Sequence, residues 1–142
     1  MQTNENRPTS VAFIAPSVTP LVTGGTGTNP AIRLYSYNLG EPHLSDMEQY
    51  YMDLRRANDG GATEWRLLYK LSETYGVPDL SVESMEKVLL MLEESEVAFQ
   101  TYYRFNTVAH EEGRSTPKKL CSVSVLYISH PCHATTFQLS AI

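Results

Sequence analysis

The residues Ile32-Arg-Leu-Tyr-Ser-Tyr37 decide the fold class, because their side chains alternate in the way that a strand requires. The isoleucine and leucine would share one face, and the arginine and both tyrosines the other. Turn-forming residues follow at 38–42, and apolar and polar side chains alternate again over residues 49–54. We therefore predict an antiparallel hairpin with one face exposed to water.

A short apolar run lies upstream of this hairpin. Residues 10–15 contain Val11-Ala-Phe-Ile14 and are closed by Pro16, which predicts a strand buried on both faces. Residues 16–30 combine prolines, glycines and threonines without any periodicity, which is typical of a loop. Loops of about 15 residues are uncommon in compact domains and often carry function.

Downstream of residue 61 the apolar period becomes helical. Thr63 is a candidate cap for a helix that would run to Tyr75 and end at Gly76, and Ser81 and Ser95 are candidate caps for two more. The three apolar stripes are Trp65, Leu68, Leu71 and Tyr75; Met85, Val88, Leu89 and Leu92; and Ala98, Tyr102 and Phe105. Such short helices must pack on one another or on the hairpin, so the predicted fold class is α+β.

Composition narrows the range of functions. The chain has 142 residues, 42% of them hydrophobic, and a formal net charge of −5. This length suits a single domain with its own core, and the negative charge argues against a nucleic-acid polymer as partner. The sequence has no run of about 18 apolar residues, so no transmembrane span is expected. Residues 1–8 lack the pattern of a signal peptide.

Two clusters invite a chemical interpretation. His130, Cys132 and His133 lie together with Cys121 upstream, but zinc sites usually take their ligands in two close pairs. We favour a tail without a metal site, and a single disulfide between the two cysteines stays open. The glycines of 24–27 lack the lysine and the following helix that a phosphate-binding loop requires, so we expect a flexible loop there.

Six segments in order resemble one known family over about residues 8–109. Together they are similar to the late part of the acid sphingomyelinase-like phosphodiesterases, and Tyr75-Gly-Val-Pro-Asp-Leu-Ser-Val-Glu-Ser-Met85 favours the lipid-phosphodiesterase-like branch over acid sphingomyelinase itself. The matching segments are Ser10-Val-Ala-Phe-Ile-Ala-Pro-Ser-Val-Thr-Pro20, Asn29-Pro-Ala-Ile-Arg-Leu-Tyr35, Tyr50-Tyr-Met-Asp-Leu-Arg-Arg-Ala-Asn58, Trp65-Arg-Leu-Leu-Tyr69, Glu73-Thr-Tyr-Gly-Val-Pro-Asp79 and Tyr102-Tyr-Arg-Phe-Asn106.

The resemblance implies a domain organisation and a cellular location. Residues 1–58 would supply the terminal strands of a calcineurin-like metallophosphoesterase sandwich, and residues 59–109 a C-terminal helical region. Residues 110–142 would form a divergent tail. Members of this family are secreted or lysosomal enzymes that hydrolyse phosphodiester or nucleotide phosphate bonds with two zinc ions. We therefore expect an extracellular or lysosomal protein.

The resemblance implies no catalytic or metal-binding residue in this chain. The family's ligand motifs, such as Asp-x-His and Gly-His-x-His, belong upstream of the matching region and do not occur here. No zinc or other cofactor is therefore expected in the chain itself. The loop after the first matching segment flanks the active-site mouth in the family, which makes Thr19, Pro20 and Leu21 candidate substrate-rim residues.

Two functions follow as hypotheses. The first is the C-terminal, non-catalytic portion of a zinc-dependent phosphodiesterase, inactive alone. The alternative is a non-catalytic interaction module that binds a relative or a lipid surface, with no partner protein identified. In either case a hairpin and three helices would leave apolar side chains uncovered, so we expect marginal folding or aggregation of the isolated chain.

Overall fold

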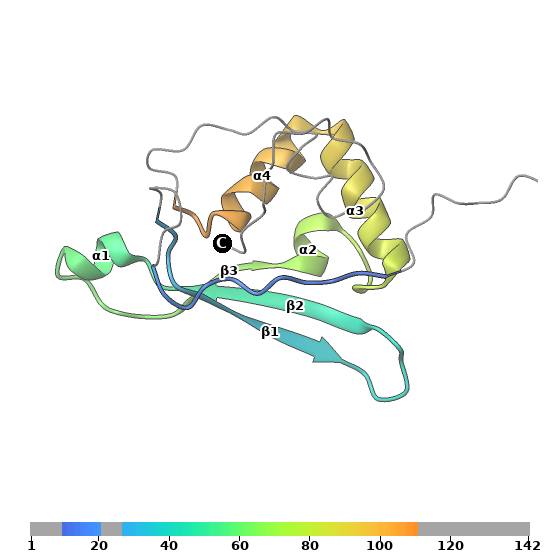
Figure 1. Cartoon of the computed structure of the whole chain (residues 1–142), viewed down its shortest axis with the longest axis horizontal. Helices are drawn as coiled ribbons and strands as arrows, with labels where there is room; N and C mark the ends of the chain where they lie inside the picture. Colours follow the sequence, from blue (N-terminus) through green and yellow to red (C-terminus); the bar gives the residue numbers. More distant parts are fainter. Residues whose placement is uncertain (1–9, 21–26, 111–142) are drawn as a thin grey trace, which may run out of the picture.

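The computed structural model describes residues 10–20 and 27–110, and this part of the chain mixes helices and strands (Figure 1). The α+β class is therefore confirmed. The elements follow in the order β1 (Ala31–Tyr37), β2 (Leu44–Tyr51), α1 (Leu54–Asn58), β3 (Arg66–Lys70), α2 (Leu71–Tyr75), α3 (Val82–Glu94) and α4 (Glu96–Asn106).

The three strands form one antiparallel sheet in the order β1-β2-β3. β1 and β2 pair from Ala31 opposite Tyr51 to Tyr37 opposite Leu44, which confirms the predicted hairpin. β2 lies earlier in the chain than the predicted 49–54. Extended structure ends near residue 51 because the Asp53 side chain accepts a hydrogen bond from the Arg56 amide at 3.1 Å and so caps α1.

The prediction of a strand buried on both faces over residues 10–15 is wrong. The segment belongs to no strand of the described sheet, and Ile14 is half exposed. Its attachment to β1 is sparse: the Phe13 and Tyr35 rings lie 5.9 Å apart, and the Ala31 amide donates to the Ser17 carbonyl at 2.9 Å. A single backbone hydrogen bond does not build a strand ladder, so the segment lies against the sheet without extending it.

The predicted helix over residues 63–75 is also wrong for most of its length. Residues 66–70 form β3, which pairs with β2, and only the last five residues form helix α2. A short apolar run can match either period, and here the pairing with a distant strand decides the outcome. The predicted end is correct, since Gly76 adopts a left-handed φ of 64° after α2.

Both predicted serine caps are confirmed. The Ser81 side chain accepts a hydrogen bond from the Ser84 amide at 3.3 Å, and the Ser95 side chain accepts one from the Ala98 amide at 3.2 Å. Ser95 also ends α3, so the chain passes directly from one helix into the next. This abrupt change of direction makes α3 and α4 pack side by side over the sheet (Figure 1).

The core lies between these helices and one face of the sheet. The stack of Tyr69 on Phe105 at 4.2 Å joins β3 to α4, and Phe99 is completely buried although the predicted α4 stripe did not include it. The buried core consists of Met47, Leu71, Tyr75, Val77, Leu80, Val88, Leu89, Leu92 and Phe99. Helices α2, α3 and α4 therefore cover a single face of the sheet, which we call the inner face (Figure 1).

Candidate functional site

The predicted rim residues Thr19 and Pro20 lie on an exposed turn that is tied to the start of β1. The hydroxyls of Ser17 and Thr19 are 3.1 Å apart, and the Thr19 amide donates to the Ser17 hydroxyl at 3.2 Å. The Ser17 carbonyl in turn accepts the Ala31 amide. Leu21 lies outside the described residues. Thr19 and Pro20 are thus exposed on a turn that Ser17 holds in place, and their role at a substrate entrance stays a prediction.

Arg33 links this N-terminal segment to the sheet and, through Gln49, to α4. Its guanidinium donates to the Gln49 side-chain oxygen at 2.7 Å and to the Ile14 carbonyl at 2.5 Å. Gln49 is fully buried, and its amide nitrogen donates to the Phe105 carbonyl at 3.3 Å. Burial raises the pKa of the neighbouring Tyr69 hydroxyl, and the charge of Arg33 opposes that rise. Polar groups on the inner face are therefore paired, as burial requires.

Asn29 holds together three parts of the chain. Its amide nitrogen donates to the Val108 carbonyl at 2.9 Å, and its side-chain oxygen accepts the Leu54 amide at 3.2 Å. Val108 and Ala109 have φ angles of 52° and 53°, a left-handed conformation that is unfavourable for residues other than glycine. The hydrogen bond from Asn29 helps to hold the chain in that conformation next to the start of β1.

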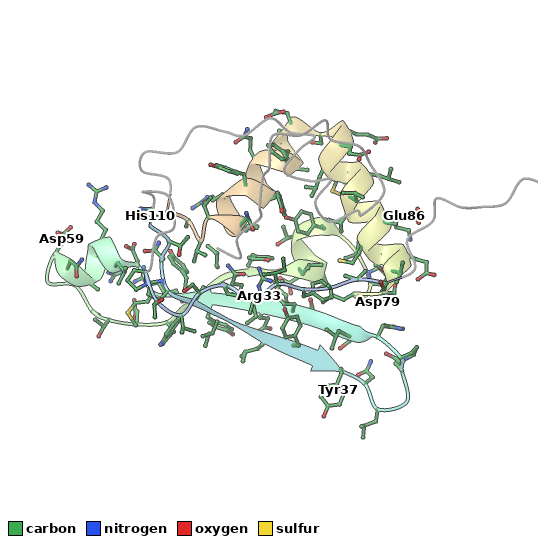
Figure 2. The ribbon with its side chains drawn as sticks, in the orientation of Figure 1. Arg33, Tyr37, Asp59, Asp79, Glu86 and His110 are labelled. Atoms are coloured by element: carbon green, nitrogen blue, oxygen red, sulfur yellow. The ribbon has the colours of Figure 1, made fainter. Side chains whose placement is uncertain are left out.

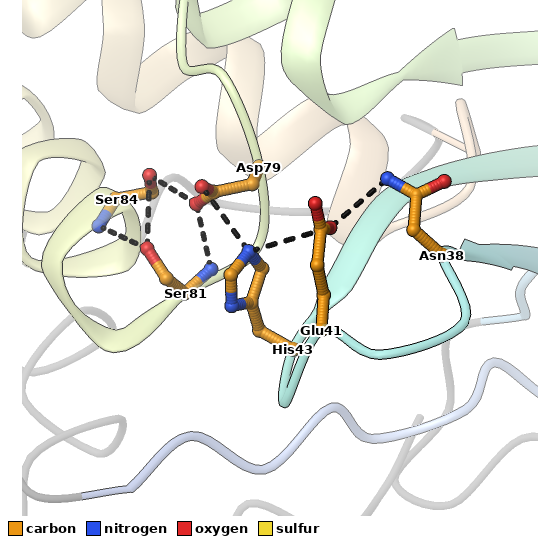
Figure 3. A network of polar contacts seen from close by, with 6 residues as sticks. All are labelled: Asn38, Glu41, His43, Asp79, Ser81 and Ser84. Carbon is orange, nitrogen blue, oxygen red and sulfur yellow. Dashed lines mark hydrogen bonds and ion pairs between the residues drawn. The ribbon is translucent and has the colours of Figure 1, made fainter.

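A polar network joins the β1–β2 turn to the N-terminus of α3 (Figure 3). The Nε2 atom of His43 lies 3.5 Å from Asp79 Oδ2 and 3.9 Å from Glu41 Oε2. Asp79 Oδ1 accepts the Ser81 amide at 2.9 Å and the Ser84 hydroxyl at 2.6 Å. Hydrogen bonds from the side chains of Ser81 and Ser84 lower the pKa of Asp79 to about 2. The network anchors α3, and sequence reasoning did not identify it.

Asp46 plays a similar part for α2. It accepts hydrogen bonds from the Ser72 hydroxyl at 2.6 Å and from the Ser72 and Met47 amides, and Lys70 Nζ lies 3.6 Å away. Burial raises the pKa of Asp46, but these hydrogen bonds outweigh burial and lower it overall. A strand residue therefore supplies the cap that the helix lacks at its own N-cap position, Lys70.

The described residues do not fit a two-zinc centre. Over residues 10–20 and 27–110, no group of three or more histidine, cysteine or acidic side chains could hold a metal ion. The network around His43 has one oxygen of Asp79 already occupied by two hydrogen bonds. Four of the predicted candidates, Cys121, His130, Cys132 and His133, lie outside the described residues, as do the glycines at 24 and 25.

A shallow depression of about 340 Å³ lies beside α1, lined by Asp53, Arg55, Arg56, Asp59 and Gly61. Two acids and two arginines give it no net charge, and Arg56 lies 3.7 Å from Glu64. This mixture favours no single class of charged ligand. None of the helices in the described part of the chain is long and apolar enough to span a bilayer.

The sheet face opposite the helices carries an apolar row beside a row that holds the charged residues Glu48 and Lys70. The strand register aligns Ile32, Tyr50 and Leu67 in one row across the three strands, with Leu34 next to Ile32 on the same face. Leu34 is 55% exposed and Leu67 is 51% exposed. At the end of β1, after the register shift that follows Ser36, Tyr37 points away from the helices (Figure 2). We call Ile32, Leu34, Tyr50 and Leu67 the outer sheet face.

Two comparisons with known proteins relate this geometry to a family. The sequence profile of the acid sphingomyelin phosphodiesterase C-terminal region matches residues 7–132. This match covers most of the chain, including every helix and strand described above.

Individual relatives agree with the family match. The chain is 41% identical to the acid sphingomyelinase-like phosphodiesterase 3b of Homo sapiens over 111 residues, which cover 75% of this chain and 24% of the relative. It is 35% identical to a cyclic GMP-AMP phosphodiesterase of Homo sapiens, covering 78% of this chain and 25% of the relative. It is also 35% identical to the sphingomyelin phosphodiesterase of Bos taurus, and that match covers 83% of this chain and 19% of the relative. The chain thus spans about a quarter or less of the length of these relatives.

Proposed function

Because the chain belongs to the family of acid sphingomyelin phosphodiesterase C-terminal regions, we propose that it works as the C-terminal, non-catalytic portion of a zinc-dependent phosphodiesterase. The observation that carries the proposal is the match to a C-terminal region combined with coverage of about a quarter of each relative. The relatives are named for a lipid and a nucleotide phosphodiester, so the substrate class is a lipid or nucleotide phosphoester. A secreted or lysosomal location belongs to the same proposal.

In this proposal, β1 and β2 are terminal strands of a metallophosphoesterase sandwich, and the zinc ions are held by the portion that precedes them. In the proposal, the described residues take no part in the hydrolytic step itself. Their contribution is positional. Thr19, Pro20 and Leu21 form part of the substrate rim. The hydrogen bond from the Ala31 amide to the Ser17 carbonyl fixes the turn that carries Thr19 and Pro20.

The proposal is tested by hydrolysis. The purified chain, supplied with zinc, should not turn over bis-p-nitrophenyl phosphate. A chimera in which the chain replaces the matched region of human acid sphingomyelinase-like phosphodiesterase 3b should hydrolyse it in a zinc-dependent manner. Clear zinc-dependent turnover by the isolated chain would refute the proposal.

The hairpin tip favours a second candidate function, contact with a lipid surface. Tyr37 is 68% exposed and Leu39 is 92% exposed, and aromatic and aliphatic side chains at a loop tip can enter the interfacial region of a bilayer. The test is flotation of the chain with phosphatidylcholine vesicles. Leu39→Glu should reduce flotation, whereas Val97→Glu, at an exposed apolar position on α4, should not. Equal flotation of both variants and the wild type would exclude the tip as the contact.

A further inference from the structure

Residues 13–17 run along β1 in the opposite direction and are attached at three alternate residues of that strand. The first attachment is a backbone hydrogen bond of 2.9 Å, the second is a hydrogen bond of 2.5 Å from a side chain, and the third is a contact between two rings 5.9 Å apart. They join Ala31 to Ser17, Arg33 to Ile14 and Tyr35 to Phe13. Because no backbone ladder holds this segment, each attachment counts separately.

Arg33 extends its attachment to the rest of the fold. Its side chain projects from β1 towards the helices (Figure 2), and its guanidinium donates to the Gln49 side-chain oxygen on β2 at 2.7 Å. Gln49 is fully buried and donates in turn to the Phe105 carbonyl of α4 at 3.3 Å. The segment is therefore joined to β2 through Arg33 and to α4 through Gln49.

The hydrogen-bond partners of Arg33 are neutral oxygen atoms. Gln49 supplies a side-chain amide oxygen, and Ile14 supplies a backbone carbonyl. None of the ion pairs within residues 10–20 and 27–110 includes Arg33. A guanidinium carries five N–H donors in a rigid planar fork, so it can bond acceptors on two different segments at fixed positions. The role of Arg33 is therefore to bridge segments, and it depends on the shape of the fork.

The attached segment leads directly to the predicted rim. Ser17 lies three residues after Ile14, and its hydroxyl accepts the Thr19 amide at 3.2 Å. Thr19 and Pro20 then stand exposed at the end of this turn. Because so few residues separate Ile14 from Thr19, a displacement of the Ile14 carbonyl would also move the turn.

We propose that Arg33 is a positioning residue for substrate binding. By holding the Ile14 carbonyl next to Gln49, it fixes the turn that presents Thr19 and Pro20 at the substrate rim. The inference rests on the proposed function, in which this rim borders the active site of the whole phosphodiesterase, and it adds the side chain that sets the position of the rim. A rim contact remote from the reacting phosphoester binds substrate and transition state alike, so its loss raises KM and leaves kcat nearly unchanged.

Steady-state kinetics of a chimera test the proposal. The chain replaces the matched region of the human cyclic GMP-AMP phosphodiesterase compared above, and cyclic GMP-AMP is the substrate. R33M removes the guanidinium and keeps a long unbranched side chain. R66M is the matched control, because Arg66 lies on β3 of the same sheet and its guanidinium bonds to Glu64. Circular dichroism checks that each variant is folded.

The expected result is a change in KM alone. R33M should raise KM about fivefold or more with kcat within about twofold of wild type, and R66M should change neither. An unchanged KM in R33M would overturn the proposal. A lower kcat at unchanged KM would overturn it too, because a merely structural role reduces the fraction of active enzyme.

R33K separates bridging from charge. Lysine keeps the positive charge, which by itself attracts an anionic phosphoester, but its ammonium group on a flexible stem lacks the planar fork. R33K should therefore have a raised KM, as R33M does. A wild-type KM in R33K would show that charge is sufficient and would overturn the bridging role.

Hydrogen exchange of the complete chain gives a second readout that needs no chimera. In R33M the Ala31 amide, which donates to Ser17, should exchange about tenfold faster, and the amides of α3 should keep their rates. An unchanged rate at Ala31, or a uniform increase over the whole chain, would overturn the proposal. If R33M does not fold, F13A replaces it in both experiments, because it loosens the adjacent attachment at Tyr35 and should act in the same directions. Wild-type KM and exchange in F13A would then overturn the proposal.

The kinetics and the zinc assay fail independently. A wild-type chimera that hydrolyses substrate with zinc while R33M keeps its KM would overturn the role of Arg33 and leave the proposed function standing. Zinc-dependent hydrolysis by the isolated chain would overturn the proposed function whatever R33M does.

Discussion

The inner and outer faces of the sheet have opposite relations between chemistry and exposure. On the inner face, Gln49 is buried and Arg33 is half-buried, and each has partners on another segment. On the outer face, Leu34 and Leu67 are apolar but open to water. The difference indicates that the helices cover the inner face, whereas Leu34 and Leu67 on the outer face stay open to water. The predictions below compare substitutions on the two faces.

The largest effect is expected in the core above the inner face. Phe99→Ala removes a completely buried ring and should lower the free energy of unfolding by about 3–5 kcal/mol. Leu34→Ala, on the outer sheet face, should cost less than about 1 kcal/mol in the isolated chain, because water already reaches that side chain. Urea unfolding followed by circular dichroism measures both. Equal losses would show that the outer face is packed after all.

A smaller effect is expected from the polar pair of Gln49 and Arg33 on the inner face. Gln49→Ala leaves the Arg33 guanidinium with one partner fewer and the Phe105 carbonyl without its side-chain donor, which should cost about 1–3 kcal/mol. Glu48→Ala, the neighbouring residue on the outer face, serves as the control and should change stability by about 0.5 kcal/mol or less. The same urea titration measures the loss of stability in both variants. A Glu48→Ala loss as large as that of Gln49→Ala would contradict the asymmetry.

The anchor of α3 gives a pH-dependent prediction. Hydrogen bonds hold the pKa of Asp79 at about 2 in the folded chain, below its ordinary value of 3.8. The resulting stability is present above that ordinary value and is lost as pH falls through the folded pKa. Between pH 5 and about 2, wild type should lose on the order of 1 kcal/mol more than Asp79→Asn. Parallel pH profiles of the two proteins would show that Asp79 carries no such linkage.

The smallest effect on stability is expected on the outer sheet face itself. Leu34→Lys should change the free energy of unfolding of the isolated chain by about 0.5 kcal/mol or less. It should also raise the concentration at which the chain stays in solution, because it interrupts the exposed apolar surface. Static light scattering across a concentration series measures this, with Leu90→Lys as the control. If Leu90→Lys reduces aggregation and Leu34→Lys does not, the surface through which the chain aggregates lies on α3.

Local signals account for the parts of the fold that the sequence predicted correctly. The serine caps at Ser81 and Ser95 and the glycine at Gly76 act within one helical turn, so their residue types are sufficient to locate the helix ends. The hairpin follows from alternation on both sides of a turn. By contrast, β3 depends on pairing with a strand some twenty residues away, and a five-residue apolar run does not reveal this pairing.

The same distinction applies to the candidate sites. Alternation predicted that the hairpin has one exposed face, but it does not tell which face the helices cover, so the apolar character of the exposed face came only from the structure. The contacts of Arg33, Asn29 and Asp79 join distant segments, and no motif marks them. Thr19 and Pro20 were placed by resemblance, and the structure adds their exposed, anchored geometry.

The account as a whole depends on the chain being a supporting region without a bimetallic centre of its own. The most direct measurement is a zinc titration of the purified 142-residue chain by isothermal calorimetry, combined with metal analysis after dialysis. The account predicts that the chain does not retain two zinc ions. Two equivalents of zinc held through dialysis, with phosphodiester hydrolysis that depends on them, would contradict it.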